Sequence, residues 1–438
     1  MYDIIYIGGG LNYAGAVVAA KRGKKVALIQ KDLKELGGTC LHRGCIPSKL
    51  FLHYGALVYE SSDEVLEGRL TLSQKKLYEK KKKLLENANK AILKQCSYFD
   101  TIEGEAKLIA PYKVSVNGDV LEAEYIVIGT GSSAFIPDGI DYDGEGVIIS
   151  DDVLNMQTLP REVAIYGTGA IGLEMASFFA SVGVKVTLLD RGENLLAHAD
   201  EAISSAMHKQ LAKMDIELLQ NRAIKSAKSS QEGVAVLYED GSSAVFEKLL
   251  VATGRRPNTE VIATKEIEVA KGIVTDAHFE TSLAKHYAIG DCNGKLQLAH
   301  AARAEVLQVT AEILGDKVKP LNLEHVVKFI HTLPMSYAFV GKIRSELESK
   351  GIKYRASKVP LSQFAYASYN HALSGIMITY VDEEEFILGA EIFAPHAEEL
   401  IAPVAMSLAG EMDVAHAKET ILAHPSFSEA LERTFYKL

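Results

Sequence analysis

Two cysteines in the stretch Gly37–Lys49 have the type and spacing needed for redox chemistry. Cys40 and Cys45 stand five positions apart, which in a regular helix means about 7.5 Å of rise and roughly 140° of rotation. A disulfide needs Cα atoms within about 6.8 Å, so the pair can bridge only where the backbone leaves the regular helix, a freedom that Gly44 supplies. Pro47 suits the first turn of a helix, which would place Cys45 near a helix N-terminus and stabilise its thiolate.

A zinc site and a pair of inert thiols are the alternatives for these two cysteines. Zinc needs further ligands at suitable spacing, and the other cysteines, Cys96 and Cys292, form no second pair. Four cysteines in 438 residues are also too few for a disulfide-stapled secreted scaffold. Inert thiols are common, but we do not expect them beside a glycine-rich turn, so the sequence favours a redox-active pair.

Gly167, Gly169 and Gly172 form a GxGxxG turn between a predicted strand and a predicted helix. The first glycine permits a tight turn, the second lets a pyrophosphate approach, and the third lets helix and strand pack closely. The helix N-terminus offers free N–H groups to the phosphates. Asp190, 21 residues after Gly169, would accept a hydrogen bond from a ribose 2′-OH, which favours NAD over NADP. Arg191 beside it would suit a 2′-phosphate, so NADP stays open as the weaker alternative.

The amino-terminal glycine turn is less regular. Gly8 and Gly10 fit the pattern, but Tyr13 stands where the third glycine belongs, with Gly15 two residues later. Gln30 takes the place of the strand-end acid, 20 residues after Gly10, and a neutral amide accepts a weaker hydrogen bond than a carboxylate. We therefore predict another dinucleotide site here, with a less regular pocket.

The elements that must position these residues form two strand–turn–helix–strand units. We predict these strands and helices at residues 4–7, 11–21 and 26–29, and again at 163–166, 173–181 and 184–189. Alternating segments at 106–120 and 234–246 predict antiparallel hairpins. A long helix is predicted over residues 70–93, and its run Lys80–Lys83 is interpreted as a solvated helix face rather than an anion site.

The composition is that of a globular protein, with 48% hydrophobic and 24% charged residues. The net charge of -10 argues against a nucleic-acid or anionic-membrane partner, because both require a basic face. The first residues run directly into a strand, and no apolar stretch reaches eighteen residues, so we expect neither a signal peptide nor a membrane span. These features predict a cytoplasmic protein.

These motifs resemble those of the class I flavin-dependent pyridine nucleotide-disulfide oxidoreductases, and within that family the dihydrolipoamide dehydrogenases. The sequence GGTCLHRGCIPSK resembles the family's redox motif, with His42-Arg43 where Asn-Val is usual. The resemblance covers the whole chain. Its other motifs are Gly129-Thr130-Gly131, Ala252–Asn258, Tyr287–Asp291, Pro395-His396 and Ala423–Glu429.

The resemblance implies an α/β fold with two Rossmann-like dinucleotide-binding domains, a central region and a C-terminal α+β dimerisation domain. The expected FAD-binding domain spans residues 1–145 and the NAD-binding domain 146–265. Residues 266–322 would form a central region that completes the FAD domain, and residues 323–438 would form the dimerisation domain of a homodimer.

FAD and NAD are the cofactors that the resemblance implies. Asp291 would bind the ribityl side of the flavin, and Ala299 would line the neighbouring pocket. The residues expected at the FAD site are Gly8, Gly10, Gln30, Gly38, Thr39, Lys49, Ala106, Thr130, Gly131, Asp291 and Ala299. The residues expected at the NAD site are Gly167, Gly169, Gly172, Glu174, Asp190 and Gly254.

The resemblance also implies roles in catalysis. Cys45 would lie against the flavin as the charge-transfer thiol, and Cys40 would be the interchange thiol that meets the substrate. Lys49, one helical turn after Cys45, would pair near the flavin with Glu174 of the second glycine unit.

His424 and Glu429 resemble the family's acid–base dyad, which is contributed across a twofold dimer interface. Thiol–disulfide exchange needs a group that titrates near neutrality to take and return the thiol proton. A carboxylate orients the imidazole and supports its cation. Ser426 and Glu429 also form a capping-box pattern at a helix start, and the two roles of Glu429 need not exclude each other.

The implied activity is oxidation of dihydrolipoamide to lipoamide with NAD+, through a Cys40–Cys45 redox disulfide and FAD. The partner would be a lipoyl-bearing protein of a 2-oxoacid dehydrogenase or glycine cleavage complex. The alternatives are an NAD(P)H-dependent reductase of another disulfide, such as glutathione disulfide, and a flavin-bearing redox or docking subunit with little turnover. A mercuric reductase is disfavoured because the tail, Thr434–Leu438, holds no cysteine pair.

Overall fold

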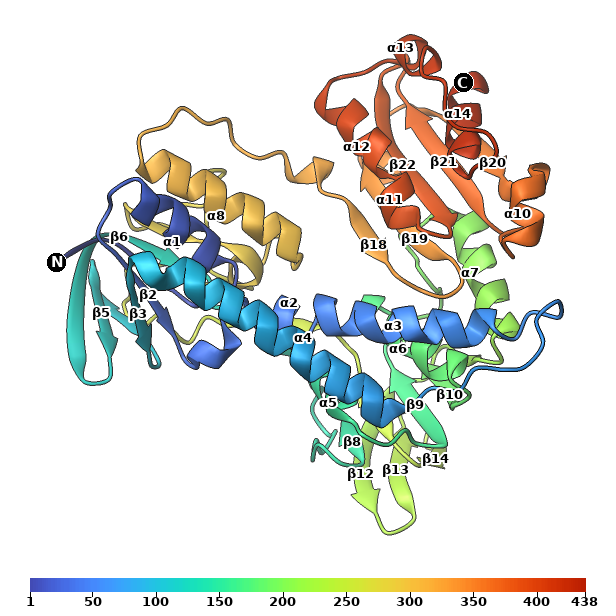
Figure 1. Cartoon of the computed structure of the whole chain (residues 1–438), viewed down its shortest axis with the longest axis horizontal. Coiled ribbons are helices and arrows are strands. Elements are labelled where there is room, and N and C mark those ends of the chain that lie inside the picture. The colour runs from blue at the N-terminus through green and yellow to red at the C-terminus, as the bar shows by residue number, and fades with distance from the viewer. The chain divides into compact units, whose positions relative to one another are not determined.

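The chain divides into two compact units, each built from separate segments of the sequence (Figure 1). The first unit comprises residues 1–48, 76–135 and 254–322, and the second comprises residues 49–75, 136–253 and 323–438. The computed structural model describes all residues from 1 to 438. The four-part domain division expected from the sequence stays a prediction.

The first unit contains a seven-stranded sheet in the order β3-β2-β1-β6-β5-β4, with β17 also paired to β6. Strands β1, β2, β3 and β17 run parallel with the end of β6, whereas β4, β5 and the start of β6 form an antiparallel meander. Central apolar residues such as Ile5 and Ile126 are fully buried, as expected of parallel strands covered on both faces. The strands are β1 (Tyr2–Ile7), β2 (Val26–Gln30), β3 (Asp100–Glu103), β4 (Lys107–Ala110), β5 (Lys113–Val116), β6 (Asp119–Ile128) and β17 (His286–Ala288).

Helices α1 (Asn12–Lys21) and α8 (Ala299–Ile313) of this unit pack against each other (Figure 1). Gly15 allows the close approach, since a Cβ atom there would lie 2.5 Å from Thr310 Oγ1 and 2.7 Å from Val306 Cγ2. Gly15 therefore lets α1 pack closely on α8, which differs from the helix–strand packing that the third glycine of such a turn provides.

The remaining elements that lie wholly or partly in the first unit are short, except for two long helices; α3 belongs to the second unit from Lys49 onward. They are η1 (Leu33–Glu35), α2 (Gly38–His42), α3 (Cys45–Glu60), α4 (Gln74–Gln95), η2 (Cys96–Tyr98), β7 (Ser132–Ala134), β16 (Arg255–Pro257) and η3 (Gly290–Asn293). Strands β7 and β16 pair with each other in a small antiparallel sheet.

Helix α4 confirms the predicted long helix, but its lysine run is not wholly solvated. Lys81 is only 4% exposed and lies on the same face as the buried Leu77 and Leu85. Its ammonium group lies 4.8 Å from the centre of the Tyr78 ring, and burial lowers the pKa of Lys81 to about 8. The solvated-face interpretation is therefore wrong for Lys81, because this position falls on the apolar stripe of the helix.

The second unit contains a five-stranded parallel sheet in the order β11-β10-β9-β15-β8 and a three-stranded antiparallel sheet, β12-β13-β14. Buried apolar residues of both sheets form one core, in which Val147 and Leu249 meet Val234 and Val236. The strands are β8 (Val147–Ile148), β9 (Glu162–Tyr166), β10 (Lys185–Leu189), β11 (Glu217–Leu219), β12 (Ile224–Ser230), β13 (Gly233–Tyr238), β14 (Ser243–Phe246) and β15 (Leu249–Val251). The helices are α5 (Ser150–Asn155), α6 (Ala170–Ser181) and α7 (Glu201–Lys213).

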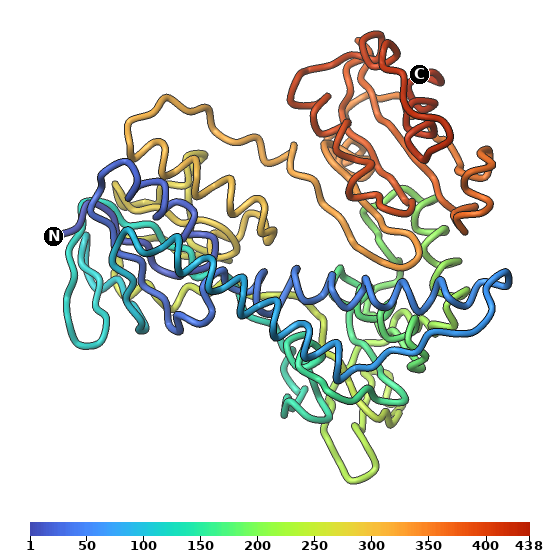
Figure 2. The backbone as a smooth tube through the Cα atoms, in the orientation of Figure 1, coloured from blue at the N-terminus to red at the C-terminus, as the bar shows by residue number.

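The C-terminal part of this unit is an antiparallel sheet in the order β18-β19-β22-β21-β20, with helices packed on its strands (Figure 2, orange to red). The strands are β18 (Lys328–Ile330), β19 (Ser336–Gly341), β20 (Arg355–Pro360), β21 (Ile376–Val381) and β22 (Ile387–Ala394). The helices are η4 (Leu323–His325), α9 (Arg344–Ser349), η5 (Leu361–Gln363), α10 (Ala365–Tyr369), α11 (Ala397–Leu400), α12 (Ala402–Ala409), α13 (Val414–Lys418) and α14 (Ser428–Tyr436). None of the chain's helices combines the length and apolar composition needed to cross a membrane.

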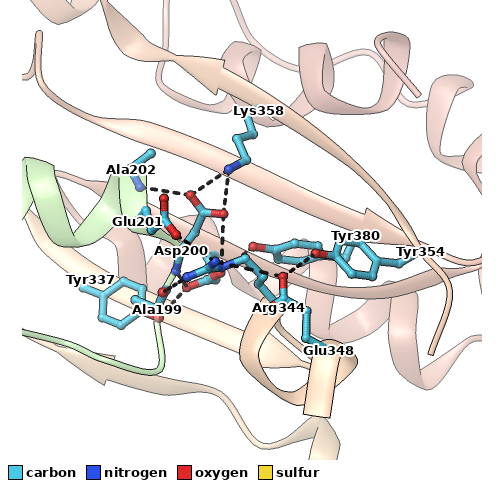
Figure 3. Close-up of polar contacts among 11 residues, drawn as sticks. Ala199, Asp200, Glu201, Ala202, Tyr337, Arg344, Glu348, Tyr354, Lys358 and Tyr380 are labelled. Atoms are coloured by element: carbon cyan, nitrogen blue, oxygen red, sulfur yellow. Dashed lines mark hydrogen bonds and ion pairs between the residues drawn. The ribbon is translucent and has the colours of Figure 1, made fainter. Parts of the chain in front are cut away.

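A buried polar cluster ties the start of α7 to this C-terminal sheet (Figure 3). Asp200 is 1% exposed; its carboxylate accepts from Lys358 Nζ at 2.6 and 2.8 Å, and its backbone N–H donates to Glu391 at 3.1 Å. The hydroxyls of Tyr337 and Tyr380 also donate to Glu391, at 2.7 and 2.6 Å. Each buried carboxylate thus has donors, as buried charges require.

Replacing Asp200 by alanine tests this cluster. The variant leaves the Lys358 ammonium without its partner and removes the N-cap that accepts from Ala202 N–H, so we expect the free energy of unfolding to fall by about 3 kcal/mol. The measurement is urea unfolding of both proteins. Asp316→Ala removes a half-exposed ion pair with Arg22 and is the control, with an expected change within about 1 kcal/mol. Equal losses in the two variants would contradict the importance of the cluster.

Candidate active site

The two cysteines of the predicted redox pair flank a break between two helices. Cys40 lies in α2 and is half-buried, whereas Cys45 is the first residue of α3 and is exposed. The break falls at Arg43 and Gly44. A Cβ atom at Gly44 would lie 3.0 Å from the carbonyl oxygen of Thr39 and 3.4 Å from Cys40 Cα. The backbone therefore leaves the regular helix where the spacing required it, and Gly44 passes directly beside Cys40.

Cys45 occupies the N-terminus of a long helix. Ser48 N–H donates to Gly44 O at 2.9 Å at the start of α3, and the first N–H groups of a helix point out of its N-terminus. Pro47, in this first turn, has no N–H to leave unpaired. The partial positive charge of this helix end favours a thiolate at Cys45.

The loop that carries Cys40 is fixed to the amino-terminal glycine turn. Gly37 N–H donates to Gly9 O at 2.9 Å. Gly38 has a φ of +64°, and a Cβ atom there would lie 2.8 Å from Gly10 Cα. Because neither backbone carries a side chain at this contact, the loop lies directly on the turn, and Cys40 follows two residues after Gly38.

The two residues that depart from the family's redox motif brace this loop. His42 Nε2 lies 2.8 Å from Leu36 O, and Arg43 Nη1 donates to Glu35 Oε1 at 2.9 Å. Both contacts reach the segment of η1 that precedes the loop. His42 and Arg43 thus add anchors at the helix break.

The two glycine turns have the same construction. A Cβ atom at Gly172 would lie 1.9 Å from Gly167 O, which is the close packing expected of the third glycine. Nothing lies within 4 Å of a Cβ atom built at Gly10 or at Gly169. Helices α1 and α6 begin beside these open positions without a side-chain cap. The open space and the helix N-termini fit a pyrophosphate at each turn, and the assignment of FAD to one turn and NAD to the other stays a prediction.

Each glycine turn accepts support from a side chain at the end of the next strand, Gln30 for the first turn and Asp190 for the second. Gln30 Oε1 accepts from Gly9 N–H at 2.7 Å. Asp190 accepts from Thr168 N–H at 2.9 Å and from Gly192 N–H at 2.6 Å. Gln30 therefore serves its turn as Asp190 serves the other, with a neutral amide in place of a carboxylate.

Asp291 and Thr130 lie in two separate hydrogen-bonded groups, which also hold residues that the sequence did not single out. Ser132 Oγ donates to Asp291 Oδ2 at 2.5 Å, and Arg255 Nε donates to Ser132 Oγ at 2.8 Å. Thr130 Oγ1 donates to Asn258 O at 2.6 Å, and Asn258 Nδ2 donates to Thr130 O at 3.0 Å. Arg255 and Asn258 belong to the family motif Ala252–Asn258, and this motif was the sequence feature that could have pointed to them.

Glu305 is a further residue that the sequence analysis missed. It is fully buried, and it accepts from Gly290 N–H at 2.7 Å and from Asn293 Nδ2 at 3.0 Å. Burial raises the pKa of Glu305, although these donors oppose the rise. Glu305 thereby holds the turn that carries Asp291. It lies in the middle of α8, outside any motif, so the sequence carried no signal for it.

The other expected FAD and NAD residues lie on turns and helix starts, with one exception. Ala299 is the first residue of α8, and Gly131 and Gly254 have φ values of +69° and +127° with open space beside them. Ala106 is 9% exposed and belongs to the apolar core of the first unit. Its role at the FAD site stays a prediction.

Lys49 and Glu174 form an ion pair in the second unit. Lys49 Nζ lies 2.6 Å from Glu174 Oε1, and Glu174 is only 6% exposed. The same oxygen accepts from the backbone N–H of His331 at 3.0 Å. Lys49 Nζ also lies 5.3 Å from the centre of the Phe329 ring. The structure thus brings together the pair that the resemblance predicted.

His424 and Glu429 also meet. His424 Nδ1 lies 2.6 Å from Glu429 Oε2, and Ser426 N–H donates to Glu429 Oε1 at 2.8 Å. Burial opposes ionisation of Glu429, but these contacts outweigh it and hold the pKa of Glu429 below its usual range. One carboxylate therefore makes contacts suited to both predicted roles, and the acid–base role stays a prediction. The reciprocal half of the capping box is absent, because Ser426 Oγ donates to Ala423 O. The His424 side chain is 80% exposed.

Comparison with known proteins agrees with this geometry. Residues 2–305 match the family model described as pyridine nucleotide-disulphide oxidoreductase, and residues 327–435 match that of its dimerisation domain. The chain is 30% identical to a dihydrolipoyl dehydrogenase of Bacillus subtilis, over 98% of this chain and 96% of the relative. It is also 30% identical to the mercuric reductase of Lysinibacillus sphaericus, over 98% of this chain and 81% of the relative. The crystal structure of LpdA from Mycobacterium tuberculosis has a TM-score of 0.91 at 25% identity, and the match covers 100% of this chain and 99% of that one.

Substitutions at the two open glycines test the two dinucleotide sites separately. Gly10→Ala and Gly169→Ala add a methyl group where the folded chain has room, so both variants should fold normally by circular dichroism. We expect Gly10→Ala to weaken FAD binding and Gly169→Ala to weaken NAD binding, each by about tenfold or more, because the methyl group occupies the space of the pyrophosphate. Each variant is the control for the other in titrations of both nucleotides. Unchanged binding of both would contradict the assignment.

Proposed function

The chain belongs to the pyridine nucleotide-disulphide oxidoreductase family, and from this premise we propose that it oxidises dihydrolipoamide to lipoamide with NAD+. FAD and NAD(H) are the family's cofactors. The observation that carries the proposal is the Cys40 and Cys45 pair at the break between α2 and α3, on a loop fixed to a dinucleotide-type turn. The likeness to dihydrolipoyl dehydrogenase over nearly the whole chain supports the choice of substrate.

The proposed chemistry at the cysteines is thiol–disulfide exchange. A substrate thiolate attacks Cys40 Sγ of the Cys40–Cys45 disulfide, a mixed disulfide forms, and Cys45 leaves as a thiolate beside the N-terminus of α3. The second thiolate of the substrate then attacks the substrate sulfur that is bonded to Cys40. Cys40 is released as a thiolate, lipoamide forms, and two electrons stay on the cysteines. Bound FAD supplies the two-electron transfer from the reduced cysteines to NAD+.

The exposed His424–Glu429 dyad is the proposed acceptor of the substrate thiol proton. In the proposal, His424 of the partner subunit takes a proton from the substrate thiol, and Glu429 orients the imidazole and stabilises its cation. The match of residues 327–435 to the dimerisation domain supports this homodimer. The Lys49–Glu174 ion pair matches the pair that the family resemblance assigns to flavin chemistry.

The proposed partner is a separate lipoyl-bearing protein of a 2-oxoacid dehydrogenase or glycine cleavage complex, and the proposed location is the cytoplasm. Hg(II), which the sequence disfavours as a substrate, is included as a comparison because the mercuric reductase has the same 30% identity as the dihydrolipoyl dehydrogenase.

A steady-state assay with matched substrate pairs tests the proposed function. We expect the FAD-loaded protein to prefer dihydrolipoamide with NAD+ over dihydrolipoamide with NADP+, by about tenfold, because Asp190 would accept from the ribose and repel a 2′-phosphate. The comparison reactions are NADPH with glutathione disulfide and NADPH with Hg(II). A strong preference for either comparison reaction would remove the lipoamide assignment.

Cys45→Ser tests the role of the exchange pair. The variant should keep bound flavin, because the glycine turn is intact, and should lose dihydrolipoamide oxidation by at least about a thousandfold, because a serine cannot form the disulfide. The measurement is turnover together with the flavin content of the purified protein. Cys96→Ala, at a buried cysteine outside the loop, is the control and should retain turnover. Full activity of Cys45→Ser would refute the role.

A further inference from the structure

Thr168 lies between the first two glycines of the second glycine turn and has no role in the proposed function. Its side-chain hydroxyl donates to Asp190 Oδ2, and its backbone N–H donates to the same oxygen at 2.9 Å. Gly192 N–H donates to the other carboxylate oxygen, Asp190 Oδ1, at 2.6 Å. Three donors from the protein itself therefore meet the carboxylate that is predicted to meet the ribose of NAD.

The first glycine turn has no side chain at the corresponding position. Gly9 stands there, and its backbone N–H donates to Gln30 Oε1 at 2.7 Å. A Cβ atom at Gly9 would lie 2.5 Å from Leu36 Cδ2 and 3.0 Å from Gln30 Cβ, so that turn has no room for a side chain. The backbone N–H contact is common to both turns, whereas the Thr168 hydroxyl is an addition found in the second turn.

Asp190 has little freedom to make room for further partners. Its backbone N–H donates to Leu219 O at 3.0 Å, and its carbonyl oxygen accepts from Arg222 N–H at 2.8 Å. A carboxylate can accept hydrogen bonds at about four positions, so the three donors from the protein leave about one position for a ligand. The adenosine ribose of NAD has two hydroxyls, whereas that of NADP has only one beside its 2′-phosphate.

We propose that Thr168 is a specificity-determining residue of the NAD site, because its hydroxyl occupies a position on Asp190 that a second ribose hydroxyl would otherwise use. This inference rests on the proposed function for the place of NAD at the second glycine turn. While Thr168 is bound, Asp190 can accept from one hydroxyl of either nucleotide. The additional 2′-hydroxyl of NAD then brings no further hydrogen bond to Asp190, so Thr168 lowers the preference for NAD over NADP.

Thr168→Ala tests the inference, because it removes the hydroxyl and keeps the backbone N–H that holds Asp190. We expect the variant to bind NAD+ about three- to tenfold more tightly, since a second ribose hydroxyl can then donate to Asp190. Binding of NADP+, which has no 2′-hydroxyl, should change by less than about twofold. The measurement is isothermal titration calorimetry of the FAD-loaded, oxidised protein with each nucleotide, without a dithiol.

Thr168→Ser is the matched control, because it keeps the hydroxyl and loses only the methyl group, and it should bind NAD+ within about twofold of the starting protein. 2′-Deoxy-NAD+ lacks the hydroxyl in question and should bind equally well to Thr168→Ala and to the starting protein. Unchanged or weaker NAD+ binding in Thr168→Ala, or an equal gain for NADP+ or for 2′-deoxy-NAD+, would overturn the inference.

The titration also separates this inference from the proposed substrate. A failed lipoamide assay together with tighter NAD+ binding in Thr168→Ala would remove only the substrate assignment, because no dithiol takes part in the titration. Absence of NAD+ and NADP+ binding in both the starting protein and the variant would overturn the inference together with the NAD site.

Discussion

The backbone contact between Gly37–Gly38 and Gly9–Gly10 is the constraint on which the predicted site depends. Gly37 N–H donates to Gly9 O at 2.9 Å. The backbones also approach so closely that a Cβ atom at Gly38 would lie 2.8 Å from Gly10 Cα. Two backbone segments approach this closely only when neither carries a side chain at the contact. The contact fixes the segment that carries Cys40 on the glycine turn, so the proposed chemistry of the cysteines and the predicted dinucleotide site would share one support.

The buried carboxylates of the second unit are all held by hydrogen-bond donors. Glu174, Asp200 and Glu391 are almost fully buried, and each accepts hydrogen bonds from fixed donors. Buried ion pairs add little to stability compared with apolar packing, but removing one partner is costly. The ion pairs therefore specify the positions of their side chains more than they stabilise the fold.

Several side chains carry a structural and a proposed chemical role at once. Glu429 accepts from the backbone of Ser426 with one oxygen and meets His424 with the other. Gln30 and Asp190 each hold a glycine turn through a backbone N–H, and each is proposed to meet a ribose. A carboxylate or amide has enough lone pairs for both partners, so the capping-box and acid–base interpretations of Glu429 are compatible.

Local features were predictable from the sequence alone. Spacing and the preferences of glycine and proline, which act over a few residues, predicted three features. These are the strand–turn–helix–strand units, the helix break between Cys40 and Cys45, and the helix start at Cys45. Contacts between distant segments were decided only by the tertiary structure. The close approach of α1 to α8 at Gly15 depends on Thr310 and Val306, almost 300 positions later in the chain. Glu305 under the Asp291 turn and Lys81 on an apolar face likewise carry no local pattern, because burial and partners are properties of the packed chain rather than of neighbouring residues.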